Sequence, residues 1–394
     1  MRCYFLLLAL VASTAQAASL RDAVEKAWQR QPAAQALGYR TEELAARRDA
    51  VSAFTPAPPS LVLRQRTDRL NSNTGTREAE VELAVPLWLP GQRDRETAVV
   101  SAEQAQLQGA SAAAKWKLAG EVREVYWQAR LADVELIVAR RRLDDAVTLA
   151  ADVERRVRAG DLARTDFNQA KAVEQSARAA LAEAEVRAFK GRQSFTLLTG
   201  FEDLPRDEEG AAPDSLVLEN HSLLRQLDQT AATADARLRL ASDIKRDNPE
   251  LAFTYRRERA IATEPFDNSV GLSIRIPFAT DGRNRPRIAA ANADLIEART
   301  TYQRERGRLE ADIAVSRREV QQTQTALALA QERLRLSAET DQLLGKAFTL
   351  GEIDLATRLR VAAERYAAEA DVARSQLEAR RAVSRLNQAM GVLP

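Results

Sequence analysis

The sequence predicts a mainly α-helical protein with a small β part, in which two halves repeat one architecture. The chain of 394 residues is rich in Ala, Arg, Glu and Leu and only 5% aromatic, a composition typical of long packed helices. Glycine and proline landmarks recur at nearly one spacing along the chain. Each half also contains two short stretches in which apolar and polar residues alternate, the pattern of a strand hairpin.

The composition excludes several classes of protein. One Cys and one His cannot build a disulfide scaffold or a Cys/His zinc module. No apolar run after the N-terminus approaches the roughly 20 residues of a transmembrane helix. The 58 basic and 56 acidic residues are interspersed along the chain, so no nucleic-acid partner is expected.

The sequence indicates neither an enzyme nor a bound cofactor. No Walker or Rossmann glycine pattern follows a strand, and no nucleophile–base pair is evident. Met390 is the only methionine besides Met1, so no methionine relay for soft metals is expected. His221, the only imidazole, lies between the two halves. We expect it to be a solvated surface residue rather than a metal ligand.

Residues 1–17 have the pattern of a cleaved signal peptide. Arg2 precedes a short apolar core at residues 4–12, and residues 15–17 (Ala-Gln-Ala) form a cleavage site. Cys3 lies before the apolar core, so it cannot be a lipoprotein acceptor. We therefore expect an exported protein of a Gram-negative bacterium without a lipid anchor.

Landmark residues separated by 191 positions divide the chain into two repeats. The matching pairs are Pro86 and Pro277, Gly91 and Gly282, Gly160 and Gly351, and Gly200 and Gly391. We predict a first repeat over 18–200, a linker over 201–216 and a second repeat over 217–394. The first two pairs mark the junctions between a strand and the helix that follows it.

Each repeat is expected to begin with a helix and two strands. Apolar residues at helical spacing predict helices over 20–53 and 217–246. The alternating stretches predict strands at about 60–68 and 78–87, and at about 250–258 and 269–278. A half-buried sheet on a soluble core and a set of outer-membrane barrel strands both show such alternation. Four strands cannot close a barrel, because about eight are needed, so a barrel would require several chains.

Long helices are expected after the second strand of each repeat. Residues 93–157 contain no proline, and 288–350 share this property. A helix of about 65 residues is on the order of 100 Å long. Apolar residues at near-heptad spacing predict coiled-coil packing. These helices end at glycine turns, predicted at 158–162 and 349–353, and a return helix of about 35 residues follows each turn.

The ordered set of features resembles the TolC family of outer-membrane efflux proteins, and within it the cobalt-zinc-cadmium cation-efflux branch. The resemblance covers essentially the whole chain after the signal peptide, although no single motif is specific. The matching features are Leu20-x-x-Ala23-x-x-x-Ala27 with Pro32, the Val85-Pro86 to Gly91-Gln92-Arg93 junction, Arg158-Ala159-Gly160 with Asp166, Leu198-Thr199-Gly200, and in the second half Ile276-Pro277, Gly282-Arg283, Leu350-Gly351 and Met390-Gly391.

The resemblance implies a homotrimer whose twelve strands form a β-barrel in the outer membrane and whose twelve helices continue it as an α-barrel through the periplasm. Such proteins are passive channels that dock with a periplasmic membrane-fusion adaptor and an inner-membrane pump of the resistance-nodulation-division (RND) class. The expected cargo is a heavy-metal cation. Drug efflux, type I protein secretion and a periplasmic coiled-coil adaptor remain as alternatives.

The resemblance also places the two glycine turns at the periplasmic tip, where the adaptor docks and the closed aperture lies. The corresponding residues are Arg158, Gly160, Asp161, Leu162 and Asp166 in the first turn, and Phe348, Gly351, Glu352, Ile353 and Asp354 in the second. Helix turns that only require glycine would show the same pattern.

The second turn departs from the family archetype, which has aspartates six and nine residues after its glycine and an arginine two residues after it. Thr357, Arg360 and Ile353 occupy these positions here. The aspartate ring is therefore absent, and Asp354 with Glu352 are the expected substitutes.

Three glutamates, Glu78, Glu80 and Glu82, share one face of a predicted strand. If the apolar face of that strand meets lipid, the glutamates line the lumen, and three copies would favour cations. Solvated side chains without a role in selectivity are the alternative.

Overall fold

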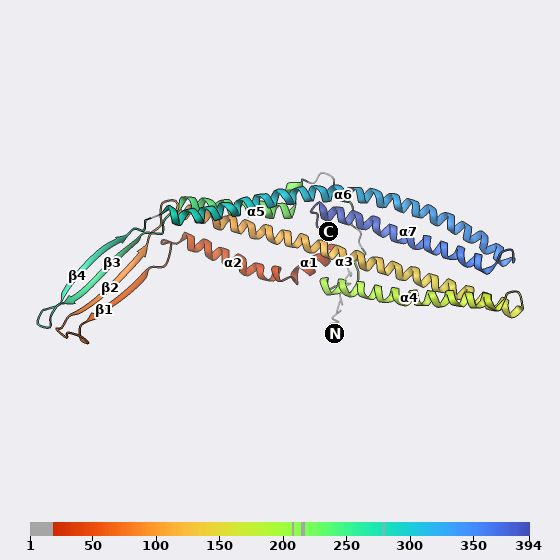
Figure 1. The fold of residues 1–394 in the computed structure, drawn as a ribbon, viewed down its shortest axis with the longest axis horizontal. Helices are drawn as coiled ribbons and strands as arrows, with labels where there is room; N and C mark the ends of the chain where they lie inside the picture. The colour runs from red at the N-terminus through yellow and green to blue at the C-terminus, as the bar shows by residue number, and fades with distance from the viewer. Residues whose placement is uncertain (1–18, 207–208, 214–216, 279) are drawn as a thin grey trace, which may run out of the picture. The chain divides into compact units, whose positions relative to one another are not determined.

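The computed structural model describes residues 19–206, 209–213, 217–278 and 280–394. The predicted signal peptide, residues 1–17, lies outside the described residues, as does part of the predicted linker. The elements in Figure 1 are α1 (Leu20–Gln29), α2 (Pro32–Ser52), β1 (Ser60–Thr67), β2 (Arg77–Pro86), α3 (Gln92–Ala159), α4 (Arg164–Thr199), the 3-10 turn η1 (Leu218–Asn220), α5 (Ser222–Asp243), β3 (Glu250–Arg259), β4 (Asp267–Arg275), α6 (Asp281–Thr349) and α7 (Leu355–Ala389). The predicted class, mainly α with a small β part, is confirmed.

The residues form two units, and each unit takes segments from both halves of the sequence. Of the described residues, unit 1 comprises those within 19–31, 115–216 and 309–394, and unit 2 comprises those within 32–114 and 217–308. The long helices α3 and α6 each contribute their first part to unit 2 and their last part to unit 1. Neither sequence repeat is therefore a separate unit.

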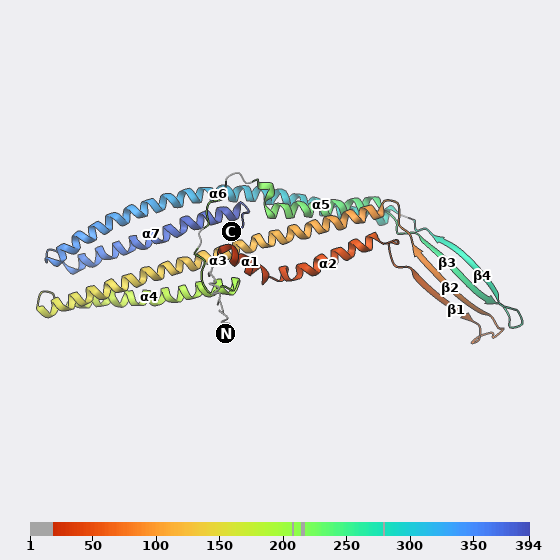
Figure 2. The same cartoon turned by 180° about the vertical axis from the view of Figure 1, so that it is seen from behind.

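Four helices of unit 1 lie side by side in the order α6, α7, α3, α4 (Figure 1 and Figure 2). An ion pair crosses each seam between neighbours. These pairs are Arg333–Asp371 at 2.8 Å between α6 and α7, Arg141–Glu369 at 2.8 Å between α3 and α7, and Arg192–Asp133 at 2.8 Å between α3 and α4. Alanines and larger apolar residues fill the seams beneath these pairs.

The short helix α1 completes the core of unit 1. It begins with a capping box, in which the Ser19 hydroxyl and the Asp22 carboxylate each accept a backbone N–H bond. Its apolar face is fully buried against Tyr126 of α3 and Phe195 of α4. The buried residues of this face are Leu20, Ala23, Val24 and Ala27.

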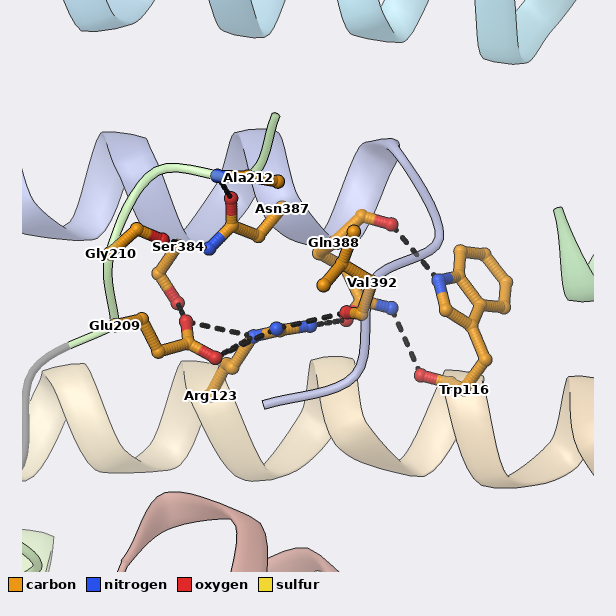
Figure 3. A network of polar contacts seen from close by, with 9 residues as sticks. All are labelled: Trp116, Arg123, Glu209, Gly210, Ala212, Ser384, Asn387, Gln388 and Val392. Carbon is orange, nitrogen blue, oxygen red and sulfur yellow. Dashed lines mark hydrogen bonds and ion pairs between the residues drawn. The ribbon is translucent and has the colours of Figure 1, made fainter. Parts of the chain in front are cut away.

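A buried polar network joins the linker and the C-terminal segment to α3, as Figure 3 shows. The Arg123 guanidinium donates to both carboxylate oxygens of Glu209 at 2.7–3.1 Å and to the Val392 carbonyl at 3.0 Å. The side chains of Arg123 and Glu209 are only 4% and 9% exposed. Asn387 of α7 donates to the Gly210 carbonyl at 2.8 Å. Breaking a buried, bidentate pair is costly, so this network fixes the end of α7 against α3.

Unit 2 contains the sheet and a second set of neighbouring helices. Ion pairs connect them in the order α2, α3, α5, α6. These pairs are Arg47–Glu103 at 2.9 Å, Arg237–Glu103 at 2.7 Å and Arg299–Asp235 at 3.5 Å.

The four strands form one antiparallel sheet in the order β1-β2-β3-β4, so β2 and β3 join the hairpins of the two halves. One face of the sheet is apolar over most of its length and lies open, and its large apolar residues, other than Val85, are at least 37% exposed. Its residues include Leu61, Leu63, Val81, Leu83, Leu251, Phe253, Tyr255, Val270, Leu272 and Ile274. The sheet therefore does not rest on a soluble core through this face.

Prolines account for the main departures from the predicted boundaries. The helix expected over 20–53 is broken at Arg30 and Gln31, because Pro32 disfavours helical geometry in the residue before it. The strand expected over 269–278 ends at Arg275, because Pro277 cannot donate to a ladder. No helix in the described ranges is long and apolar enough to cross a membrane.

His221 is buried, and the expectation of a solvated surface residue is wrong. Only 2% of the residue is exposed, and its Nδ1 accepts the N–H of Leu223 at 3.2 Å as the N-cap of α5. Burial lowers the pKa of His221 from 6.5 to about 4. The neutral imidazole is therefore the form that the fold stabilises.

The lowered pKa predicts a loss of stability in acid. Because the pKa of His221 is lower in the folded chain than in the unfolded one, its contribution is complete above about pH 6.5 and declines as the pH falls towards 4. The expected loss is on the order of 3 kcal/mol across this interval. Thermal unfolding of the wild type and of His221→Asn, which retains a good N-cap, measures it. Identical pH profiles for the two proteins would contradict this account.

Candidate functional site

The first glycine turn connects α3 to α4. Gly160 has a φ of +90° and its N–H donates to the Val157 carbonyl at 3.2 Å. The Asp161 N–H donates to the Arg156 carbonyl at 2.9 Å. A positive φ favours glycine, so the glycine is required for the backbone to reverse here. The Asp166 carboxylate accepts the N–H of Ala163, the N-cap residue of α4, at 2.9 Å and so stabilises the first turn of this helix.

The second glycine turn connects α6 to α7 and has the same geometry. Gly351 has a φ of +78° and donates to the Phe348 carbonyl at 3.1 Å, and Glu352 donates to the Ala347 carbonyl at 2.9 Å. Asp354 is the N-cap of α7 and accepts the N–H of Thr357 at 2.8 Å. Hydrogen bonds from Thr357 hold the pKa of Asp354 below its usual value.

The structure brings the two turns together through one apolar cluster in unit 1. Phe348 of α6 and Leu355 of α7 are 4% and 1% exposed, and they pack with Ala150, Val153 and Ala170 of the other hairpin. Phe348 is one of the predicted site residues, and two more line this cluster, Leu162 from the first turn and Ile353 from the second. The cluster holds the turns as one surface.

Arg156 connects the turns in a second way, which the sequence analysis missed. Its guanidinium carbon lies 5.0 Å from the centroid of the Phe348 ring, and Nη1 donates to the Phe348 carbonyl at 3.2 Å. Arg158, which the sequence analysis chose, instead pairs with Glu154 of its own helix at 2.9 Å and is largely exposed. The two arginines lie two positions apart on α3, so they project in different directions.

The remaining predicted residues of the second turn lie apart from the apolar cluster. Thr357 belongs to the N-cap of α7, and Arg360 pairs with Glu364 one turn further at 2.8 Å. Gly351 and Glu352 are exposed at the apex, as Gly160 and Asp161 are at the first turn. Both apices thus present a glycine and a carboxylate to solvent.

A polar cluster ties α3, α6 and α7 together close to the turns. Arg365 of α7 pairs with Asp145 of α3 at 2.9 Å and with Asp341 of α6 at 3.3 Å. Arg358 also pairs with Asp341, and the Tyr366 hydroxyl donates to Asp145. Burial, followed by this hydrogen bond, raises the pKa of Tyr366. We call these five residues the three-helix cluster; it lines a groove of about 570 Å³.

None of the residues of the three-helix cluster was predicted from the sequence. Asp145 and Tyr366 are 221 positions apart, so no local pattern connects them. The one available signal was the seven-residue spacing of Arg358 and Arg365, which places both on one face of a helix.

The three glutamates lie on the polar face of the sheet and are paired with arginines. Glu80 is only 5% exposed and lies between Arg64 of β1 at 2.6 Å and Arg256 of β3 at 2.7 Å. Glu82 also contacts Arg64 at 3.3 Å, and Glu78 contacts Arg256 at 3.2 Å. The negative charge of this face is therefore largely balanced within the sheet.

The four predicted strand–helix junction residues occupy different positions relative to the strands and helices in the two halves. Gly91 has a φ of +76° just before α3, whereas Gly282 lies within the first turn of α6. Pro86 ends β2, and Pro277 follows the end of β4. Among the described residues, no group of three or more His, Cys, Asp or Glu side chains is placed to hold a metal ion.

No protein-family model and no curated protein sequence matches the chain. Solved structures match it closely in fold. CusC, which forms a transmembrane channel, gives a TM-score of 0.78 at 17% identity over 96% of each chain. VceC, an outer-membrane protein of Vibrio cholerae, gives 0.75 at 16% identity over 95% of this chain and 96% of that one. The MtrE outer-membrane channel of Neisseria gonorrhoeae, in its open state, gives 0.73 at 19% identity over 95% and 89%. The chain thus has the TolC-like fold of these outer-membrane proteins.

Phe348 is predicted to hold the two turns together. Replacing it with alanine leaves a cavity in the apolar cluster and is expected to destabilise unit 1 by about 3–5 kcal/mol. Hydrogen exchange of the full chain should show faster exchange at both turns, not only at the second. Leu350→Ala is the matched control, because Leu350 is 74% exposed and its removal should change stability by no more than about 0.5 kcal/mol. Faster exchange confined to the second turn would show that Phe348 does not connect them.

Proposed function

We propose that this protein is the outer-membrane channel of a tripartite efflux system, a passive exit duct formed by a homotrimer. The observation that carries the proposal is the open four-stranded sheet, with an exposed apolar face and an ion-paired polar face. A sheet of this kind suits a barrel wall that has lipid on one side and water on the other. The TolC-like fold shared with outer-membrane proteins supports the same assignment.

The edges of the sheet favour association of several chains. β1 and β4 are the edge strands, and neither contains a proline within its bounds. Unpaired backbone groups at such edges pair readily with another strand, and in a lipid environment they must be paired. Pairing β4 of one chain with β1 of the next is a heterologous contact that closes into a ring. A ring of three chains contains about twelve strands, enough to form a barrel.

The edge helices of unit 1 favour the same arrangement. Leu329, Leu336 and Leu343 of α6 are spaced by seven residues and are 68%, 51% and 59% exposed. At the other edge, Val186 and Phe189 of α4 are 53% and 64% exposed. Apolar residues at heptad spacing are typical of a coiled-coil seam, so α6 of one chain and α4 of the next are suited to pack together.

The two glycine turns are the proposed docking surface for a periplasmic membrane-fusion adaptor, which would connect the channel to an inner-membrane RND pump. The shared apolar cluster would keep the two turns in a fixed arrangement, and their exposed apices would leave backbone groups accessible to a partner. The three-helix cluster beside them would hold the aperture closed, in place of the missing aspartate ring. Asp354 caps α7, which leaves Glu352 as the more accessible of the two expected substitutes.

Heavy-metal cations are the proposed cargo, on the basis of the sequence resemblance. Drug efflux and type I protein secretion use the same fold and are the alternatives. Deleting the gene and comparing tolerance to zinc, cobalt, cadmium, copper and a drug panel distinguishes them. Sensitivity to drugs alone would exclude the metal assignment.

Gly351→Pro is predicted to abolish efflux while the trimer still assembles. Proline fixes φ near −65° and lacks the N–H that donates to Phe348, so the second turn cannot keep its shape. Resistance should fall to that of the deletion strain, with trimers still recovered from the outer membrane. Gly307→Ala in the interior of α6 is the control, since an added Cβ there meets open space. Wild-type resistance in Gly351→Pro would refute the docking role.

Replacing Glu78, Glu80 and Glu82 together with glutamine is predicted to shift ion selectivity towards anions. The change removes three carboxylates and leaves Arg64 and Arg256 without their acidic partners on the polar face. Reversal potentials in planar bilayers under a salt gradient measure the shift. Glu264→Gln, in the exposed loop between β3 and β4, should leave the potential unchanged. An unchanged ion preference in the triple variant would show that the three glutamates do not determine selectivity.

A further inference from the structure

The apolar face of the sheet ends in basic residues near the hairpin loops. Along β3, alternate residues point to this face in the order Leu251, Phe253, Tyr255, Arg257, Arg259. The side chains therefore change from aliphatic to aromatic to basic over five positions. Barrel strands show a comparable change where the apolar band meets the membrane–water interface.

A third arginine from β2 lies beside these two. Arg77 is the direct cross-strand partner of Arg259, and Arg257 is the partner of Ala79 one step along the same face. Residues opposite each other in an antiparallel pair have Cβ atoms about 4.5–5.5 Å apart, and like charges there are destabilising. In the described part of the chain, none of these three arginines has a carboxylate within ion-pair distance.

Phe266 from the loop between β3 and β4 holds two of the guanidinium groups close together. Its ring centroid lies 4.5 Å from the guanidinium carbon of Arg257 and 4.8 Å from that of Arg259. Arg259 also donates from Nε to the Gly75 carbonyl at 3.2 Å, which connects it to the other hairpin loop. The ring and the carbonyl position the arginines without neutralising their charge.

We propose that Arg77, Arg257 and Arg259, the arginine cluster, bind the phosphate group of a lipid headgroup in the outer leaflet. Guanidinium groups donate bidentate hydrogen bonds to phosphate, and a dianion between three arginines removes their mutual repulsion. The adjacent Tyr255 and Phe253 offer an exposed surface to the acyl chains of the same lipid. The inference rests on the proposed function, because only there do the hairpin loops face the phosphorylated glycolipid of the outer leaflet.

The test uses the full-length purified trimer in detergent and two probes, bisphosphorylated lipid A and the same lipid with both phosphates removed. Wild-type protein should bind the phosphorylated lipid at least about tenfold more tightly, since each arginine near a charged surface contributes appreciably to binding. The double variant Arg77→Gln/Arg257→Gln should lose this preference. Arg66→Gln removes an arginine at the same level on the opposite face of the sheet and should keep it.

A wild-type protein without the preference, or a double variant that retains it, would overturn the proposal. Inorganic phosphate is the third probe; if it binds as tightly as the lipid, the cluster is a free-anion site and the lipid assignment fails. Measurements of bilayer conductance distinguish failure of the lipid-binding proposal from failure of the proposed channel function. The double variant should conduct as the wild type does, because its changes lie on the apolar face, whereas a wild-type protein that forms no channel would refute the function itself.

Discussion

Neighbouring helices of this protein meet along narrow seams of small residues, and the burial of these seams is the interaction on which its helical parts depend. Ala119, Ala177 and Ala368 are completely buried. Gly191 of α4 lies so near α3 that an added Cβ would be 2.9 Å from the Ala129 Cα. Such close approach maximises dispersion contacts but buries little area per residue. Helices of 68 and 69 residues, α3 and α6, accumulate the burial that a short seam could not supply.

Charged residues serve two different purposes around these seams. Most cross-seam ion pairs have at least one largely exposed partner, so each contributes little stability and serves mainly to define which residues lie opposite each other. The Arg123–Glu209 pair differs, because both side chains are buried and bonded on several sides. Loss of one partner there would leave a buried charge, which makes this network a strong constraint on the linker.

Local patterns were sufficient to predict the element types, because each has its own periodicity. The alternation of Val81, Leu83 and Val85 with glutamates located β2 to within about one residue. Features that depend on distant partners were not predictable. The burial of His221 and the contact of Tyr366 with Asp145 arise only when helices pack side by side. The turn glycines were identified, whereas Arg156 was overlooked because nothing in the sequence places it against Phe348.

The pairing of β2 with β3 has a consequence for how the chain acquires its structure. Arg77 pairs with Arg259 and Pro86 with Glu250, so the strand that completes the sheet follows its partner by more than 160 residues. Contacts of such high sequence separation form slowly, since a large loop must close before they are made. During synthesis the β2 edge of the first hairpin therefore stays unpaired, and its apolar face stays exposed, while α3 and α4 are produced. An exposed edge of this kind is prone to wrong pairing until the second half of the chain has been made.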